Sequence, residues 1–385
     1  MNGKKTRICI ILLSLLASCA DNKELSCPIL DVSSPQEATP SEVFSSVEVI
    51  PFTMPEGTYM SDVRTLFSIG DKYIVKDKNN IVYLFSTDGR YISHSERTRG
   101  HGHGEHTNLM GFTYNPYSKQ IELTTPNNLL FYDTLFHDVK SVPLPSRWPE
   151  GRESGCFYGD IYDLSPSLHL LKPLGTSKEP RQICVFDSEK GKIIKTIPFI
   201  KYCICRTSMQ SKCFYMRKDG TMLFFPPCIS ECLFTFDTNT FSITPYLSLD
   251  FGEQGYDAEV LREQSGKDVE TVIKFLQEYK KGMPMTHLPL GDNLIIEVTF
   301  GKYIRNCKTL VVNTTSGKHY LIKRYQQGKK MVLPYLSEAC ENGVLAAVEA
   351  NELESLLEQF DEKDVIMPSR PIDPDGYVIL KYRLK

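Results

Sequence analysis

Residues 81–93 have the sequence IVYLFSTDGRYIS, in which two apolar runs flank a polar turn. An Asp-Gly pair between such runs predicts a β-hairpin, because both residue types tolerate the backbone angles of a tight turn. The same order recurs along the chain: an apolar strand that ends near Asp or Asn, a turn, and a second strand. Its further copies lie at 129–142, 183–197, 233–247 and 310–322.

The hairpins return at irregular intervals of about 45 to 76 residues. A weak repeat of this size, made of short strands with no long helix between them, is typical of the blades of a β-propeller. The composition agrees with a globular chain, since 41% of the 385 residues are hydrophobic and 24% are charged. The sequence therefore predicts an all-β protein built as a propeller.

Two segments break the β pattern and predict short helical insertions on the rim of the ring. Between Asp257 and Lys281, apolar residues from Val269 onward recur at spacings of three and four, which is typical of an amphipathic helix. A shorter helix is expected from Asn351 to Phe360, with Asn351 as its N-cap. Its apolar face would consist of Leu353, Leu356, Leu357 and Phe360.

The N-terminal segment has the layout of an export signal. Basic residues precede an apolar run over residues 8–17, which is shorter than the roughly 20 residues that a membrane-spanning helix needs. The run ends in Leu16-Ala17-Ser18-Cys19, which resembles the lipobox of bacterial lipoproteins. This resemblance implies that residues 1–18 are removed as a signal peptide and that Cys19 is lipidated, for example with palmitate. The anchor would hold the protein on the outer membrane, facing the periplasm or the cell surface.

The remaining chain divides into a tether and a body. Residues 19–42 comprise the lipidated cysteine and a polar, proline-containing stretch that predicts a flexible tether. Residues 43–385 are expected to form the propeller. The strand at 43–51 should join the strand at 377–384 in the last blade, because ring closure removes exposed sheet edges. Without residues 1–18 the chain carries 41 basic and 47 acidic groups, so nucleic acid is not an expected partner.

The segment 47–143 resembles the start of the six-bladed β-propeller lipoproteins of Gram-negative gut anaerobes. That family shows a Phe-x-x-Asp-Gly hairpin and then a loop similar to Gly-Arg-Gly-Pro-Gly-Glu-Tyr. Here Phe85-Ser86-Thr87-Asp88-Gly89 and the loop at 100–106 take those places, with His103 and His106 at the Pro and Tyr positions. The resemblance covers nearly the whole chain after residue 18. It implies six blades, and it brings no settled activity.

The loop at 100–106 also raises the question of a metal site. It holds His101, His103 and His106 beside Glu105, and these residue types ligate transition metals. Their spacing matches no strong metal motif, and a glycine-rich loop would organise such a site poorly. The favoured interpretation is a structural turn between blades that carries solvated histidines, with Glu105 bonded to backbone N–H groups.

Ten cysteines remain once Cys9 leaves with the signal and Cys19 carries lipid. In an exported protein they could form disulfides. Several lie inside apolar strand-like runs, as Cys184, Cys203 and Cys205 do, and there they are expected to act as small buried hydrophobes.

The function is predicted as a choice between two classes. The preferred one is a membrane-anchored binding or scaffold module for a glycan, a peptide or an envelope protein. The alternative is a lyase- or lactonase-type propeller enzyme with a metal-assisted site in the central channel. The sequence holds no nucleophile elbow or nucleotide loop, so no cofactor is expected and catalysis is left open. Aromatic rings stack on sugars and peptides, and the ligand-binding candidates are Tyr114, Tyr117, Trp148, Phe157 and Tyr158.

Overall fold

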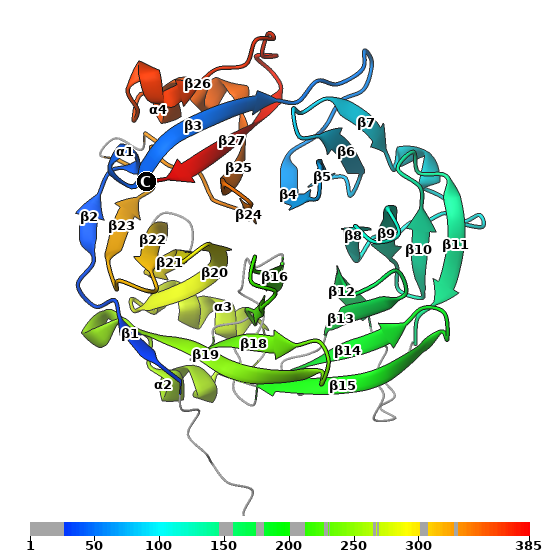
Figure 1. Ribbon diagram of the computed structural model, residues 1–385, viewed down its shortest axis with the longest axis horizontal. Helices are drawn as coiled ribbons and strands as arrows, with labels where there is room; N and C mark the ends of the chain where they lie inside the picture. Colours follow the sequence, from blue (N-terminus) through cyan, green and yellow to red (C-terminus); the bar gives the residue numbers. More distant parts are fainter. Residues whose placement is uncertain are drawn as a thin grey trace, which may run out of the picture.

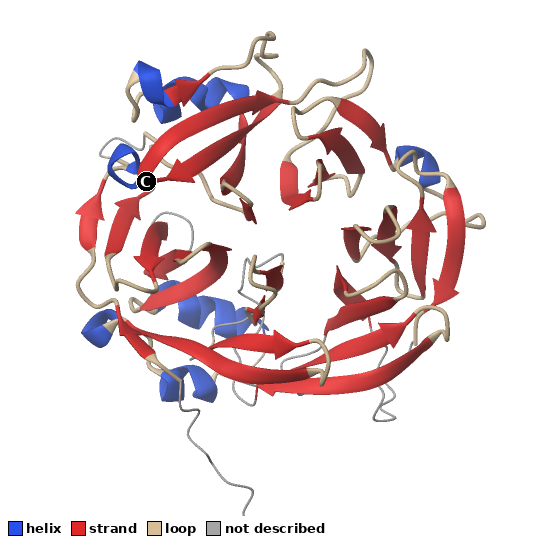
Figure 2. Ribbon diagram, viewed as in Figure 1, coloured by secondary structure: helices blue, strands red, loops and turns tan. Residues whose placement is uncertain are grey.

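The computed structural model describes residues 27–145, 157–174, 181–200, 212–226, 230, 232–264, 267, 269–300, 307–326 and 330–385. Its strands form six separate sheets that stand around a central axis as the blades of a propeller (Figures 1 and 2). The prediction of an all-β, six-bladed propeller with short helical insertions is confirmed. No described helix has both the length and the apolar character needed to cross a membrane.

Blades 1 to 3 are four-stranded antiparallel sheets whose first strand lies nearest the axis (Figure 1). The third and fourth strands of each are the hairpins that the sequence predicts. Blade 1 consists of β4 (Val63–Ile69), β5 (Lys72–Asp77), β6 (Val82–Ser86) and β7 (Tyr91–His94), blade 2 of β8 (Gly111–Asn115), β9 (Gln120–Thr124), β10 (Asn128–Tyr132) and β11 (Asp138–Pro143), and blade 3 of β12 (Phe157–Asp163), β13 (Leu168–Leu174), β14 (Arg181–Asp187) and β15 (Lys192–Ile200).

Blades 4 and 5 repeat this arrangement and gain a fifth, parallel strand at their outer edge. The added strands come from the N-terminal part of the chain. Blade 4 consists of β16 (Phe214–Met216), β17 (Met222–Phe224), β18 (Leu233–Asp237), β19 (Ser242–Asp250) and β1 (Ile29–Asp31), and blade 5 of β20 (Gly282–Leu290), β21 (Asn293–Phe300), β22 (Cys307–Asn313), β23 (His319–Lys323) and β2 (Gln36–Ala38).

The two added strands correct the expected tether. Residues 29–38, placed in a flexible tether by their polar sequence, instead pair in parallel with β19 and β23. The physical reason is that a sheet edge offers unpaired backbone N–H and C=O groups, which any passing backbone can satisfy whatever its side chains. Val32, next to β1, donates its N–H to the carbonyl of Asp250 at 2.8 Å, and its side chain is 1% exposed.

Blade 6 closes the ring with strands from both ends of the chain (Figure 1). As predicted, the strand at 43–51 pairs with the strand at 377–384, and Ile50 lies opposite Ile379 in the antiparallel register. A short strand at 365–366, which follows the second helical insertion, pairs in parallel with the strand at 43–51. The blade consists of β24 (Glu338–Cys340), β25 (Gly343–Glu349), β27 (Tyr377–Leu384), β3 (Phe44–Pro51) and β26 (Val365–Ile366).

Most of the helical elements lie at the outer edge of the ring, whereas the helix just before β20 overlaps blades 4 and 5 in this view (Figures 1 and 2). The expected amphipathic helix from Val269 onward is confirmed as α3 (Val269–Glu278), and a second helix, α2 (Ala258–Glu263), precedes it in the same segment. The remaining helical elements are α1 (Pro40–Val43), α4 (Leu353–Leu357) and the 3-10 turns η1 (Glu96–Thr98), η2 (Gly252–Gln254), η3 (Ala350–Glu352) and η4 (Glu362–Asp364).

The second expected helix is shorter than predicted, and its cap is different. The 3-10 turn η3 takes up Asn351, so Glu352 rather than Asn351 is the N-cap of α4. A 3-10 turn uses tighter hydrogen bonds and is common at helix ends, where sequence signals for the first residue are weak. The predicted apolar face is confirmed, because Leu353, Leu356 and Phe360 are buried against the largest core cluster.

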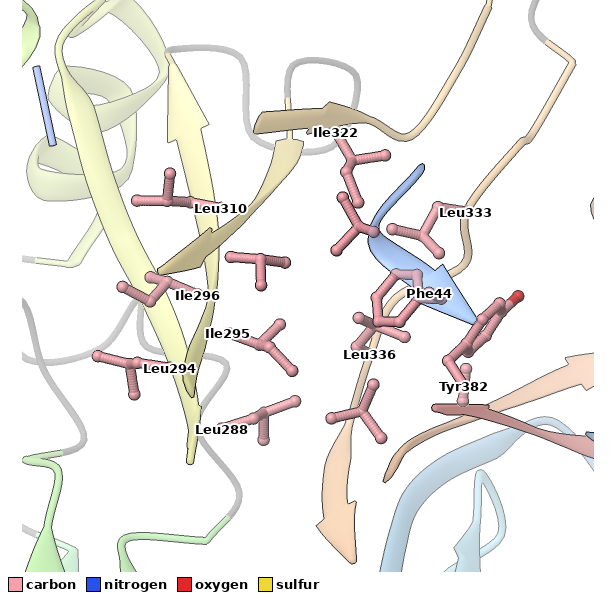
Figure 3. Packing of buried hydrophobic residues seen from close by; sticks show 14 of the residues in the cluster. Phe44, Leu288, Leu294, Ile295, Ile296, Leu310, Ile322, Leu333, Leu336 and Tyr382 are labelled. Carbon is pink, nitrogen blue, oxygen red and sulfur yellow. The ribbon is translucent and has the colours of Figure 1, made fainter. Parts of the chain in front are cut away.

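That cluster joins blades 4, 5 and 6 and includes the closing strand β3 (Figure 3). Phe44 of β3 and Tyr382 of β27 pack with their ring centroids 5.2 Å apart. Facing them are apolar side chains of blade 5, among them Leu288 and Ile295 (Figure 3). The ends of the chain are therefore held by apolar packing as well as by strand pairing.

The described cysteines are free thiols, and most are buried. Cys184 is fully buried in β14, which confirms its expected role as a small hydrophobe. Cys203 and Cys205 lie outside the described residues. Cys27, just before β1, has its Sγ 3.1 Å from Sγ of Cys232, next to β18.

Candidate functional site: the central cavity

A cavity of about 1010 Å³ lies at the centre of the ring. Its wall is built from the C-terminal ends of the innermost strands β4, β8, β12, β16, β20 and β24, together with the turns that follow them. All six blades therefore contribute to one concave surface. The two strands that close the ring also line it, through Ser45 of β3 and Arg383 of β27. Concave sites of this size, lined by apolar side chains and a few polar groups, are where proteins bind small molecules.

The wall carries both cationic and anionic side chains, and these form ion pairs with one another. Lys172 pairs with Asp160 on neighbouring strands of blade 3. Arg217, after β16, lies between Asp219 at 3.5 Å and Asp292 of blade 5 at 3.6 Å. The wall therefore presents donors and acceptors side by side, which suits a polar ligand that offers both.

A second pair lies deeper and links the cavity to the seam between blades. Lys212 donates from Nζ to Oε1 of Glu338 at 2.7 Å, and the Glu338 side chain is fully buried. Burial raises the pKa of Glu338 to about 7, although Lys212 opposes this shift. Glu338 does not itself line the cavity, so Lys212 is the member of this pair that a ligand could reach.

The five aromatic candidates take different positions. Tyr114 and Tyr117 both line the cavity, and Tyr117 is 54% exposed. Phe157 is exposed at the start of β12, whereas the cavity lies at the other end of that strand. Tyr158 has no exposed surface and donates its hydroxyl to the carbonyl of Pro145, so it packs in the core instead of facing a ligand. Trp148 lies outside the described residues.

A buried cluster of three ionisable side chains lies beside the cavity, between blades 2 and 3. Among the described residues, one group of His, Cys, Asp or Glu could hold a metal: Glu122, Asp163 and His169, whose nearest ligand atoms lie within 4.8 Å of one another. Nδ1 of His169 is 2.8 Å from Oδ1 of Asp163 and 3.1 Å from Oε2 of Glu122. Asp163 also lines the cavity.

The charges of this cluster depend on one another. Burial and then the adjacent Glu122 raise the pKa of Asp163 well above its usual range. Burial alone would lower the pKa of His169, but the carboxylates of Asp163 and Glu122 outweigh it and raise that pKa to about 9. The cluster therefore binds protons more tightly than Asp163 and His169 would as separate side chains.

Sequence reasoning missed this cluster for a clear reason. Glu122 lies in Gln120-Ile121-Glu122-Leu123-Thr124, where polar and apolar residues alternate as in a strand with one solvated face. In the ring both faces of β9 are covered, and Glu122 is 0% exposed. Asp163 and His169 flank a turn, where polar residues are ordinary. No local signal separates the three from surface residues.

The histidines of the glycine-rich loop do not come together as a site. The loop connects blades 1 and 2, as expected, and Oε2 of Glu105 accepts a hydrogen bond from the N–H of Gly102 at 2.8 Å. His101 and His103 are exposed, but His106 is buried, which corrects its expected solvation. Arg99 and His106 form an isolated β-bridge, and burial lowers the pKa of His106.

Comparisons with known proteins agree with this fold. One similar solved structure is an exported protein from Bacteroides fragilis NCTC 9343, with a TM-score of 0.68 and 15% identity over 93% of this chain and 99% of that one. Another is a member of the DUF4221 family from Bacteroides vulgatus ATCC 8482, with a TM-score of 0.54 and 12% identity over 89% of this chain and 99% of that one. These identities show the fold alone. No curated protein matches the chain.

The expected resemblance to a propeller family of gut anaerobes is thus confirmed at the level of the fold. A family model matches residues 27–373, which run from the segment before β1 to the segment before β27 and so include the whole cavity wall except the end of β27. The chain belongs to the family described as "Domain of unknown function (DUF4934)".

Proposed function

We propose that the protein is a lipid-anchored binding protein of the cell envelope that binds a glycan in its central cavity. The observation that carries the proposal is the combination of an exposed ring, Tyr117, with ion-paired carboxylates and cations in one concave wall. Sugars stack on aromatic rings and exchange hydrogen bonds with such groups. A small polar ligand fits a cavity of about 1010 Å³ better than a flat protein surface does.

Anchoring is the second element of the proposal. The sequence Leu16-Ala17-Ser18-Cys19 supports lipidation of Cys19, and the similarity to an exported protein supports a place in the envelope. The mature protein should carry an acylated N-terminal Cys19 in mass spectra. Recovery of an intact N-terminus from the membrane fraction would contradict this part of the proposal.

Binding is favoured over catalysis because cavity carboxylates have cationic partners. Asp160, Asp219 and Asp292 each pair with Lys172 or Arg217. Such pairing occupies the oxygens that acid–base chemistry would use. A lyase- or lactonase-type enzyme is the second candidate, and the observation that favours it is Asp163, a cavity residue that also belongs to the buried cluster.

A glycan panel and isothermal titration with the mature protein test the proposal. We expect Tyr117→Ala to weaken glycan binding by tenfold or more, which corresponds to about 1.4 kcal/mol of binding free energy. The matched control is Tyr59→Ala, because Tyr59 is 87% exposed and does not line the cavity. Equal glycan affinity in both variants would contradict the proposed site. If the protein bound peptides but no glycan, the ligand would be a peptide instead of a glycan. Turnover of a lactone or a glycan would favour the enzymatic alternative.

A further inference from the structure

The cluster of Glu122, Asp163 and His169 leaves one buried carboxylate oxygen without a hydrogen-bond partner among the described residues. Nδ1 of His169 can carry one proton, and that proton has hydrogen-bond geometry toward Asp163 at 2.8 Å. Oε2 of Glu122 lies 3.1 Å from the same nitrogen, yet among the described residues it has no hydrogen-bond partner although it is buried. Such an oxygen costs free energy unless a cation serves it. One cation at the centre would serve all three side chains at once.

The surroundings of the cluster already orient its atoms as they would be needed around an ion. Nε2 of His169 lies 3.0 Å from Oγ of Ser188, so with its proton there Nδ1 is free to act as a ligand. Nδ2 of Asn115 donates to Oε1 of Glu122 at 2.9 Å, which leaves Oε2 for the ion. Outer hydrogen bonds of this kind are the usual support of metal ligands.

The distances and the access route also fit. Two ligand atoms at about 2.1 Å from an ion and at right angles to each other are about 3.0 Å apart, and the two distances to Nδ1 are 2.8 and 3.1 Å. Glu122 and His169 are 0% exposed, whereas Asp163 reaches the wall of the central cavity, from which an ion could enter. The rings of Phe131 and Phe186 flank His169 with centroids 5.8 and 6.4 Å away and exclude water on that side.

We propose that Glu122, Asp163 and His169 bind one divalent transition-metal ion of the Mn²⁺ or Zn²⁺ class in the seam between blades 2 and 3. One imidazole nitrogen with two carboxylate oxygens is a donor set that these ions accept, whereas Ca²⁺ prefers oxygen donors alone. Binding would displace the proton at Nδ1, so the solution should acidify as the ion enters. The proposed metal site does not require a particular ligand in the cavity, although Asp163 belongs to both.

The test uses Mn²⁺ alone, because the buried free thiols of the chain would compete for Zn²⁺. The mature protein in detergent is stripped with a chelator and titrated with Mn²⁺, and the free ion is followed by electron paramagnetic resonance. We expect one saturable site with proton release. Glu122→Gln and His169→Gln should each weaken Mn²⁺ binding at least 100-fold. Ser188→Ala, which removes only a positioning residue, should weaken it about 10- to 100-fold.

The matched control is His103→Gln, because His103 belongs to the alternative histidine cluster in the glycine-rich loop and is exposed. This variant should bind Mn²⁺ as the unmodified protein does. Loss of binding in His103→Gln, or full binding in Glu122→Gln, would overturn the proposal, and so would the absence of any saturable site.

A measurement on the unmodified protein tests the proposal even if the variants fail to fold. Mn²⁺ bound at this site should show hyperfine coupling to one imidazole nitrogen in pulsed spectra. Bound Mn²⁺ without nitrogen coupling would overturn the proposal, because the ion would then be held by oxygen ligands alone.

Discussion

Two seams between blades differ in how they hold their buried charged side chains. The seam around blade 5, which includes the closing strand β3, is a large apolar cluster with Ile295, Leu336 and Tyr382 fully buried (Figure 3). It buries one carboxylate, Glu297, which accepts hydrogen bonds from Thr309 and from the N–H of Leu336. The seam between blades 2 and 3 has a smaller apolar cluster and buries Glu122, Asp163 and His169 together. Apolar packing tolerates small changes in geometry, whereas buried charges require particular partners. The first seam therefore holds the ring closed, and the second defines a site.

The largest expected effect concerns ring closure. Deletion of residues 375–385 removes β27 and leaves β3 and β25 without their shared neighbour. We expect loss of cooperative folding of the whole body, since both exposed edges and an opened apolar seam result. Circular dichroism and thermal unfolding of the truncated protein measure it. Melting of the truncated protein like the full chain would mean that closure at this seam is dispensable.

A single truncation in the apolar seam should have the next largest effect. Ile295 is 0% exposed in the cluster, so Ile295→Ala should lower the free energy of unfolding by about 2–5 kcal/mol. Ile194→Ala is the matched control, because Ile194 is 43% exposed on β15 and should change stability by about 0.5 kcal/mol or less. Denaturant unfolding compares them, and equal losses would show that this seam is not the dominant one.

The stability that the polar seam provides should depend on pH; this seam lies between blades 2 and 3 and buries Glu122, Asp163 and His169. With the pKa of His169 raised from 6.5 to about 9, its stabilising effect is complete below about pH 6.5 and is lost as the pH rises toward 9. The raised pKa of Asp163 acts in the same direction over a lower range, from about pH 3.8 up to about 8, because the folded state again holds the extra proton. Stability of the metal-free protein should therefore fall between pH 6.5 and 9, by at most about 1.4 kcal/mol per pH unit for each proton.

Asp163→Asn should flatten this fall, which denaturant unfolding with chelator at several pH values would measure. His287, also buried, offers an internal contrast: it stacks on Phe225, and burial lowers its pKa to about 3. Its contribution is complete above about pH 6.5 and is lost as the pH falls toward 3, so it affects the acid side alone. An unchanged alkaline slope in Asp163→Asn would contradict the charged state assigned to the polar seam.

The smallest expected effect concerns the N-terminal strands. Val32 is buried next to β1, so Val32→Ala should lower stability by about 1.5 kcal/mol, roughly 0.8 kcal/mol for each buried methyl-sized group removed. Ile29→Ala, at a position 72% exposed, is the control and should change little. No change in Val32→Ala would mean that residues 29–38 behave in solution as the tether that their polar sequence suggests.

The hairpins, the closing strands and the apolar face of Leu353, Leu356 and Phe360 could be predicted from sequence, because turn residues and alternation act within a few neighbouring positions. The strands β1 and β2, the burial of Glu122 and His106, and the choice of Tyr117 over Tyr158 as a cavity residue could not. The strands β1 and β2 depend on the free edges of β19 and β23, and the burial of Glu122 depends on which surface of β9 meets another blade. That meeting involves residues such as Glu122 and His169, far apart along the chain, so only the closed ring brings their charges together and buries them.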